Sequence, residues 1–105
     1  MNIEENINKI KIILSLKKLL EKGKNLQKEF KDNKIVYSYH EVASNALLRK
    51  ATVNDTLNGK TIPKATTLIS IVEGMGFNMI DFSVEFDSIS EADIKTYINQ
   101  HINKI

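Results

Sequence analysis

The chain has 105 residues, of which 42% are hydrophobic and 27% are charged, and its formal net charge is +2. This length suits one domain with a single hydrophobic core, and the lack of cysteine excludes disulfides, thiolate metal ligands and cysteine nucleophiles. The net charge is too small to indicate a nucleic-acid partner by itself, so function has to be inferred from residue positions.

The start of the chain lacks the basic flank and the continuous apolar stretch of a signal peptide. No run approaches the roughly 18 apolar residues of a membrane span. We therefore expect a soluble, cytoplasmic protein with no membrane partner. Charge is unevenly distributed, with a balance of +3 over residues 1–33, zero over 34–86 and −1 over 87–105.

Apolar residues recur at helical spacing through most of the chain, which predicts an all-α fold. The first predicted helix covers about residues 3–22, and Gly23 is its expected stop. Its apolar face is formed by Ile3, Ile7, Ile10 and Leu14. Residues 24–37 are harder to interpret, although Asp32-Asn33 suggests a break.

A second helix is predicted to begin after Ser38, because Ser38 and Glu41 have the spacing of a capping box. A third helix is expected from about Lys50 to Leu57, ended by Asn58-Gly59.

A fourth helix is predicted at about 65–74, after Pro63, and Asn78 is placed to cap a short fifth one. The last helix opens with Ser90, and Asp93 follows three residues later. Its predicted apolar face consists of Ile94, Tyr97, Ile98, Ile102 and Ile105.

The spacing of a few residues in the middle of the chain is the most informative feature of the sequence. Ala43 is followed ten positions later by Val53 and then by Asn58-Gly59. Two helices that cross at a steep angle and are joined by a short turn need a small residue where their axes approach. They also need an aliphatic residue on the second helix that packs against the first. This register resembles the helix-turn-helix of the Cro/lambda-repressor-like (XRE) family.

The resemblance covers about 45 residues and continues through Pro63, Thr67-Leu68, Ile71, Gly76 and Phe82. It implies a lambda-repressor-like five-helix bundle with an extra C-terminal amphipathic helix. Residues 34–86 would form the helix-turn-helix core, 1–33 would complete the bundle, and 87–105 would be a possible dimerisation element.

Two positions depart from the family pattern. Leu47 replaces the turn glycine, and a leucine with positive φ would cost roughly 1 kcal/mol. Either the turn is built differently or this strain is accepted. Thr56 stands where the family usually has an inward Ile or Leu.

The resemblance implies that the third helix lies in the major groove with its first half at the base edges. The matching positions imply five base-reading residues: Lys50, Ala51, Thr52, Asn54 and Asp55. They also imply four phosphate contacts: Tyr39, Arg49, Asn58 and Lys60. Basic residues at a helix start are unfavourable because they oppose the helix dipole. The presence of Arg49 and Lys50 there therefore favours a role in binding an anion.

The function implied by the resemblance is a transcriptional regulator, most plausibly a repressor, that binds duplex DNA as a homodimer. The alternative is an antitoxin-like interaction module that uses the C-terminal stripe or the Leu47-Leu48 surface, with a toxin as its partner. The C-terminal stripe could also pack within its own chain. No catalytic residue set, metal site or cofactor motif is present, and His40 and His101 are far apart in sequence. We therefore expect neither an enzyme nor a cofactor.

Overall fold

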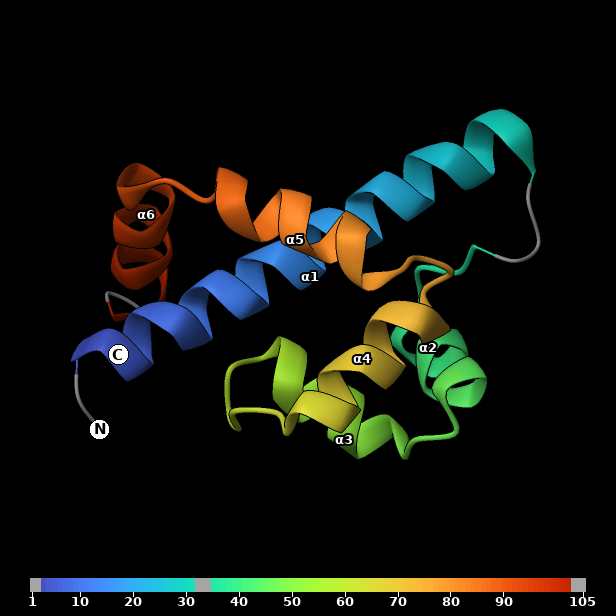
Figure 1. Ribbon diagram of the computed structural model, residues 1–105, viewed down its shortest axis with the longest axis horizontal. Coiled ribbons are helices and arrows are strands. Elements are labelled where there is room, and N and C mark those ends of the chain that lie inside the picture. Colours follow the sequence, from blue (N-terminus) through green and yellow to red (C-terminus); the bar gives the residue numbers. More distant parts are fainter. Residues whose placement is uncertain (1–2, 32–34, 103–105) are drawn as a thin grey trace.

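The computed structural model describes residues 3–31 and 35–102, and within those ranges it contains six helices and no strand. The helices are α1 (Ile3–Phe30), α2 (Tyr39–Ala46), α3 (Lys50–Leu57), α4 (Ala65–Gly74), α5 (Met79–Ser88) and α6 (Glu91–Ile102) (Figure 1). The prediction of an all-α fold is confirmed. The predicted bounds of the third and fourth helices are also confirmed.

The first helix does not stop at Gly23, so that prediction was wrong. α1 continues for another two turns, and Lys31 follows it with a left-handed φ of 52°. Gly23 is buried, and a Cβ built on it would lie 3.1 Å from Ile35 Cγ2. Gly23 therefore lies at a close packing contact with the Ile35 side chain inside α1 and does not end the helix. The Asp32-Asn33 break lies outside the described residues.

The hydrophobic core is gathered around α1, which packs against α3, α5 and α6. α1 contributes Leu16 and Leu19, both fully buried. The other buried members of the core come from the loop before α2 and from α2 to α5: Val36, Val42, Ala43, Val53, Leu57, Ile71, Val72, Met75 and Phe82. Burying such side chains is the main favourable contribution to folding.

The predicted helix caps are observed, with one difference. The Ser38 hydroxyl accepts the Glu41 N–H at 3.1 Å but donates to Glu41 Oε1 at 2.9 Å, so the carboxylate does not cap the Ser38 backbone. Asn78 caps α5 in a complete reciprocal box with Asp81. Ser90 and Asp93 form the same two reciprocal bonds, at 2.9 and 3.1 Å, at the start of α6.

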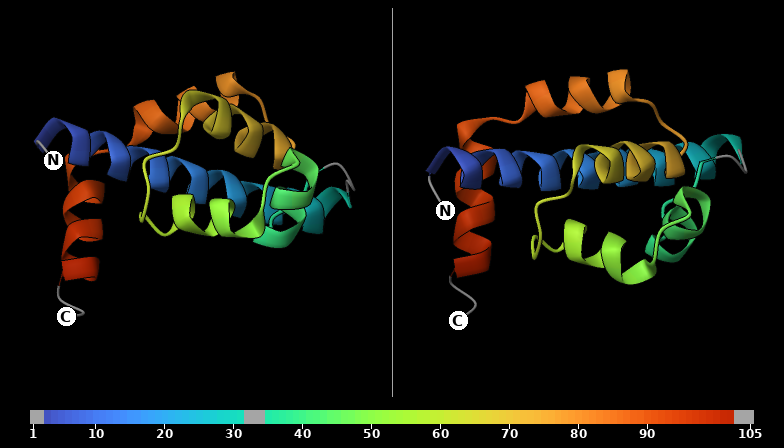
Figure 2. Two further views of the ribbon diagram at one scale, coloured as in Figure 1. Left: turned by 90° about the horizontal axis from the view of Figure 1, so that it is seen from below. Right: turned by 60° about the horizontal axis from the view of Figure 1, so that its bottom comes forward.

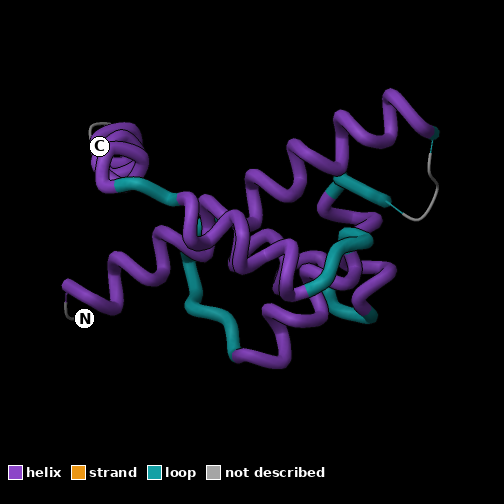
Figure 3. Tube along the Cα trace, turned by 45° about the horizontal axis from the view of Figure 1, so that its top comes forward, coloured by secondary structure: helices purple, strands orange, loops and turns teal. Residues whose placement is uncertain are grey.

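The last helix projects away from the rest of the molecule. α6 crosses α1 steeply, so it is seen almost end-on in Figure 3 while α1 runs across the view. Both views of Figure 2 show α6 extending on the side of α1 where α3 lies. α5 ends at Ser88, so the expected domain boundary at 86 falls inside it.

Candidate nucleic-acid interface

The α2–turn–α3 unit is built from two eight-residue helices and a turn of three residues, 47–49. α2 ends in a Schellman motif, in which the Leu47 N–H bonds to Ser44 O at 3.2 Å and the Leu48 N–H to Ala43 O at 2.9 Å. Leu47 has φ 56° and ψ 39°, and its side chain is 92% exposed. The turn therefore adopts the left-handed conformation with leucine in place of glycine.

α2 is held against α4 by an unusually close approach at Gly74. A Cβ built on Gly74 would lie 2.8 Å from Val42 O and 2.9 Å from Ala46 Cβ. The Asn45 side-chain amide also donates to Gly74 O at 3.2 Å. This contact fixes the position of α2, and with it the turn that leads into α3. The sequence pattern showed Gly74 only as a helix end.

The inner face of α3 consists of Val53, Thr56 and Leu57, all at most 2% exposed. The Thr56 hydroxyl donates to Thr52 O at 2.9 Å, which satisfies its hydrogen-bonding group inside the core. Threonine is therefore buried at this position without leaving an unpaired hydroxyl, although it is not the expected aliphatic side chain.

The five expected base-reading residues are not equally exposed on α3. Lys50 and Ala51 are exposed, and Asp55, one turn after Ala51 on the face opposite Val53, is half-buried. Thr52 is half-buried and its carbonyl accepts the Thr56 hydroxyl. Asn54 is also half-buried.

Asn54 is the residue of this set that is directed most clearly inward. Its Oδ1 is buried and has no hydrogen-bond partner among the residues that the structure describes. A buried acceptor without a partner costs free energy. In this conformation the Asn54 oxygen is therefore not displayed to a ligand.

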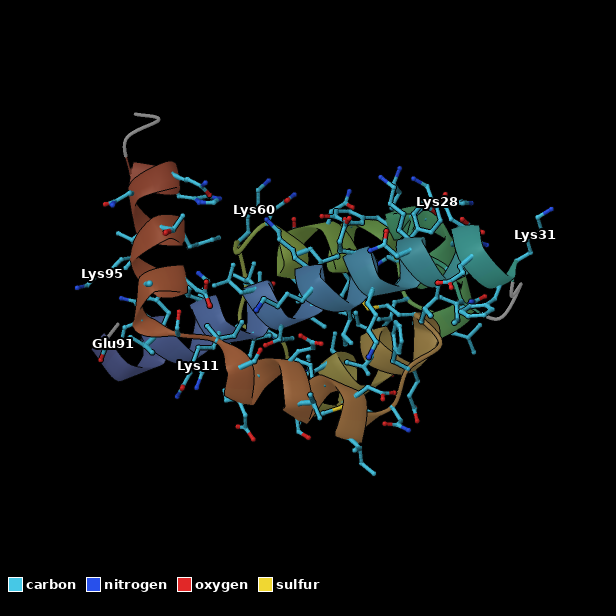
Figure 4. The ribbon with its side chains drawn as sticks, turned by 90° about the horizontal axis from the view of Figure 1, so that it is seen from above. Lys11, Lys28, Lys31, Lys60, Glu91 and Lys95 are labelled. Carbon is cyan, nitrogen blue, oxygen red and sulfur yellow. The ribbon has the colours of Figure 1, made fainter. Side chains whose placement is uncertain are left out.

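The four expected phosphate contacts surround α3. Arg49 precedes it, Asn58 and Lys60 follow it, and these three side chains are exposed. Tyr39, the first residue of α2, is half-buried. In Figure 4 the Lys60 side chain points to the same side of the molecule as the free end of α6, whereas Lys11 points to the opposite side.

The electrostatics at the start of α3 favour an anion. Arg49 is the N-cap, its side chain makes no capping hydrogen bond, and the first turn contains no acidic residue. The first backbone N–H groups of a helix carry partial positive charge, and here basic side chains add to it. The backbone N–H groups and the side chains of Arg49 and Lys50 therefore both contribute positive charge at this end of α3.

Comparison with protein-family models, curated proteins and solved structures finds no match for this chain. Within residues 3–31 and 35–102, no helix is long and apolar enough to cross a membrane. The same residues contain no group of three or more His, Asp or Glu side chains placed to hold a metal ion.

Proposed function

We propose that this chain binds duplex DNA through α3 and acts as a sequence-specific transcriptional regulator, most simply a repressor, with a lambda-repressor-like bundle as its scaffold. The observation that carries the proposal is the α2–turn–α3 unit, with its three-residue turn and an α3 that exposes one polar face. Helices in units of this kind enter the major groove, which is wide enough to admit one helix.

Within this proposal, side chains on α3 divide into two roles. Lys50 donates to guanine O6 and N7, Ala51 contacts a thymine methyl group, and Asp55 accepts from cytosine N4. Arg49 and Lys60 hold the phosphates on either side of α3 and carry no sequence information. An Asn54 that also reads bases has to rotate its amide outward on binding.

The salt dependence of binding to a duplex of unrelated sequence tests this electrostatic role. The logarithm of the association constant falls linearly with the logarithm of salt, by about 0.9 for each phosphate neutralised. We expect Arg49→Gln/Lys60→Gln to make that slope shallower by about 1.8. Lys31→Gln, which removes a charge at the far end of α1, is the matched control and should keep the wild-type slope (Figure 4). A folded wild-type protein that binds no duplex at low salt would contradict the proposal.

We also propose that the DNA-binding form is a homodimer, because operators read by such units have two half-sites about one helical turn apart. The surface that suits this contact is an apolar groove of about 500 Å³ between α1 and α6. Four isoleucines line it, together with the polar residues Asn6, Glu91 and Lys95: Ile7, Ile10, Ile94 and Ile98. Sedimentation velocity tests the dimer, and a protein that stays monomeric on its selected duplex would contradict it.

The second candidate is an antitoxin-like module that binds a protein partner such as a toxin. Large apolar side chains that are exposed favour it, above all Leu47 at 92%, Ile80 at 74%, Phe30 at 66% and Val84 at 62%. Exposed apolar clusters often mark protein contacts. This candidate gains support if the salt titration shows no duplex binding.

A further inference from the structure

α6 meets the loop that follows α3, a contact between segments far apart in the sequence. A Cβ built on Gly59 would lie 3.0 Å from Tyr97 Oη and 3.0 Å from Ile13 Cδ1. Lys9 Cε is 4.0 Å from the same point. The Tyr97 hydroxyl and the Lys9 side chain therefore converge on the backbone immediately after α3, next to Lys60.

These residues border a groove of about 320 Å³ between α1, α6 and the Gly59 loop. Its walls include Lys9, Ile13, Gly59, Tyr97 and His101, and no carboxylate is among the described side chains that line it. Lys17, whose Nζ is 5.9 Å from the centre of the Tyr97 ring, lines a separate neighbouring pocket together with Glu21 and Asp93 and does not border this groove. Among the described residues that line it, the groove thus combines one lysine, Lys9, with the hydroxyl donor of Tyr97.

The phenol is held in place by His101. The two rings stack with their centres 3.9 Å apart, and His101 Nδ1 lies 2.8 Å from Tyr97 O. Because a carbonyl oxygen only accepts, Nδ1 is the donor of that bond. Partial burial raises the pKa of the Tyr97 hydroxyl, so it stays protonated at neutral pH.

The position of the groove relates it to α3. α6 extends on the α3 side of the molecule (Figure 2), and Lys60 points the same way as the free end of α6 (Figure 4). A duplex with α3 in its major groove would therefore bring a backbone phosphate past the Gly59 loop toward this groove.

We propose that Lys9 and Tyr97 bind a phosphate of the DNA backbone that lies outside the segment read by α3, with His101 as a positioning residue. α6 then acts as a lateral arm that lengthens the contact along the backbone. This inference rests on the proposed function, and it assigns to α6 a DNA-binding role in addition to any role in dimerisation.

The test measures duplex affinity over a range of salt for three single variants. Lys9→Gln removes a phosphate-neutralising charge, so we expect weaker binding and a slope shallower by about 0.9. Tyr97→Phe removes a hydrogen bond but no charge, so affinity should fall about threefold to tenfold with the slope unchanged. Lys31→Gln is the control, because Lys31 lies at the far end of α1 from Lys9, and it should behave as wild type (Figure 4).

The outcomes separate this inference from the proposed function. If wild type binds duplex and both Lys9→Gln and Tyr97→Phe keep its affinity and slope, the phosphate site is wrong and the DNA-binding proposal stands. If wild type binds no duplex, both proposals fail. If the variants weaken binding only by changing the oligomeric state in sedimentation velocity, the groove is an interface between copies and the inference is overturned. Thermal unfolding of each variant confirms that it is folded.

Discussion

Helices α2, α3 and α4 each end in the same type of hydrogen-bonded turn. The three turns differ in the residue that adopts the left-handed conformation. Gly59 and Gly76 occupy this position after α3 and α4, with φ of 76° and 93°. Leu47 occupies it after α2, with φ 56°. Glycine carries no steric penalty there, whereas an L-residue with a side chain does. The α2–turn–α3 unit therefore contains a local strain that the turns after α3 and α4 avoid.

We predict that Leu47→Gly stabilises the protein. Relief of the left-handed strain contributes about 1–2 kcal/mol, and the greater freedom of glycine in the unfolded chain offsets about 0.4–1 kcal/mol of it. The free energy of unfolding, measured by urea denaturation, should rise by about 0.5–1 kcal/mol. Leu47→Ala keeps the strain and should change stability by less than about 0.5 kcal/mol. A loss of stability in Leu47→Gly would contradict this account of the turn.

Gly74→Ala should destabilise the protein, because its new Cβ would meet Val42 O and Ala46 Cβ at less than 3 Å. Forcing α2 away from α4 costs about 1–3 kcal/mol, which outweighs the roughly 1 kcal/mol that alanine gains in a helix. Glu73→Ala, at the exposed neighbouring position, is the control and should stay within about 0.5 kcal/mol of wild type. Equal unfolding midpoints for all three proteins would show that the approach of α2 to α4 is not tight.

At the scale of single elements, local signals in the sequence predicted some helix bounds and could not predict others. The bounds of α3 and α4 follow from the sequence because helix-breaking residues lie within a few positions of them. These residues are Asn58-Gly59, after α3, and Pro63, before α4. Gly23 carries the same local signal but is explained by contact with Ile35 and Phe77, which no linear pattern contains.

The candidate site could also be predicted only in part from the sequence. Helical periodicity places Ala51 and Asp55 on the outer face of α3, because the face on which a residue lies depends only on its spacing along the helix. It does not show that Asn54 Oδ1 is buried, or that Tyr97 meets the Gly59 loop, because both depend on tertiary packing.

We expect the stability of the first turn of α6 to depend on pH. Hydrogen bonds from Ser90, first from its backbone N–H, hold the pKa of Asp93 below its usual value of 3.8. A lowered pKa means that the ionised carboxylate stabilises the folded state above that usual value. This contribution is lost as the pH falls through the lower, folded-state pKa.

We therefore expect amide hydrogen exchange in the first turn of α6 to speed up, relative to the core, as pH is lowered below about 4. Asp93→Asn should remove that dependence, whereas Glu91→Gln, an exposed change in the same turn, should retain it. An unchanged pH response in Asp93→Asn would assign the effect to another group.

For the molecule as a whole, we expect base reading and phosphate binding to depend on different residues. Lys50→Ala should alter which duplexes are preferred, because it removes a donor to base edges and costs about 1–3 kcal/mol at one base pair. Lys60→Ala should weaken binding to all duplexes alike, because phosphates carry no sequence information. Affinities for a panel of single-base variants of one duplex measure both effects. A uniform loss in both mutants would refute the division of roles.

The most direct test of the central claim is selection of bound duplexes from a random-sequence pool, with wild type and Lys50→Ala in parallel. The account predicts that wild type enriches a motif, in inverted repeats if a dimer binds, and that Lys50→Ala alters or loses it. Failure of folded wild-type protein to enrich any motif would contradict sequence-specific binding by α3.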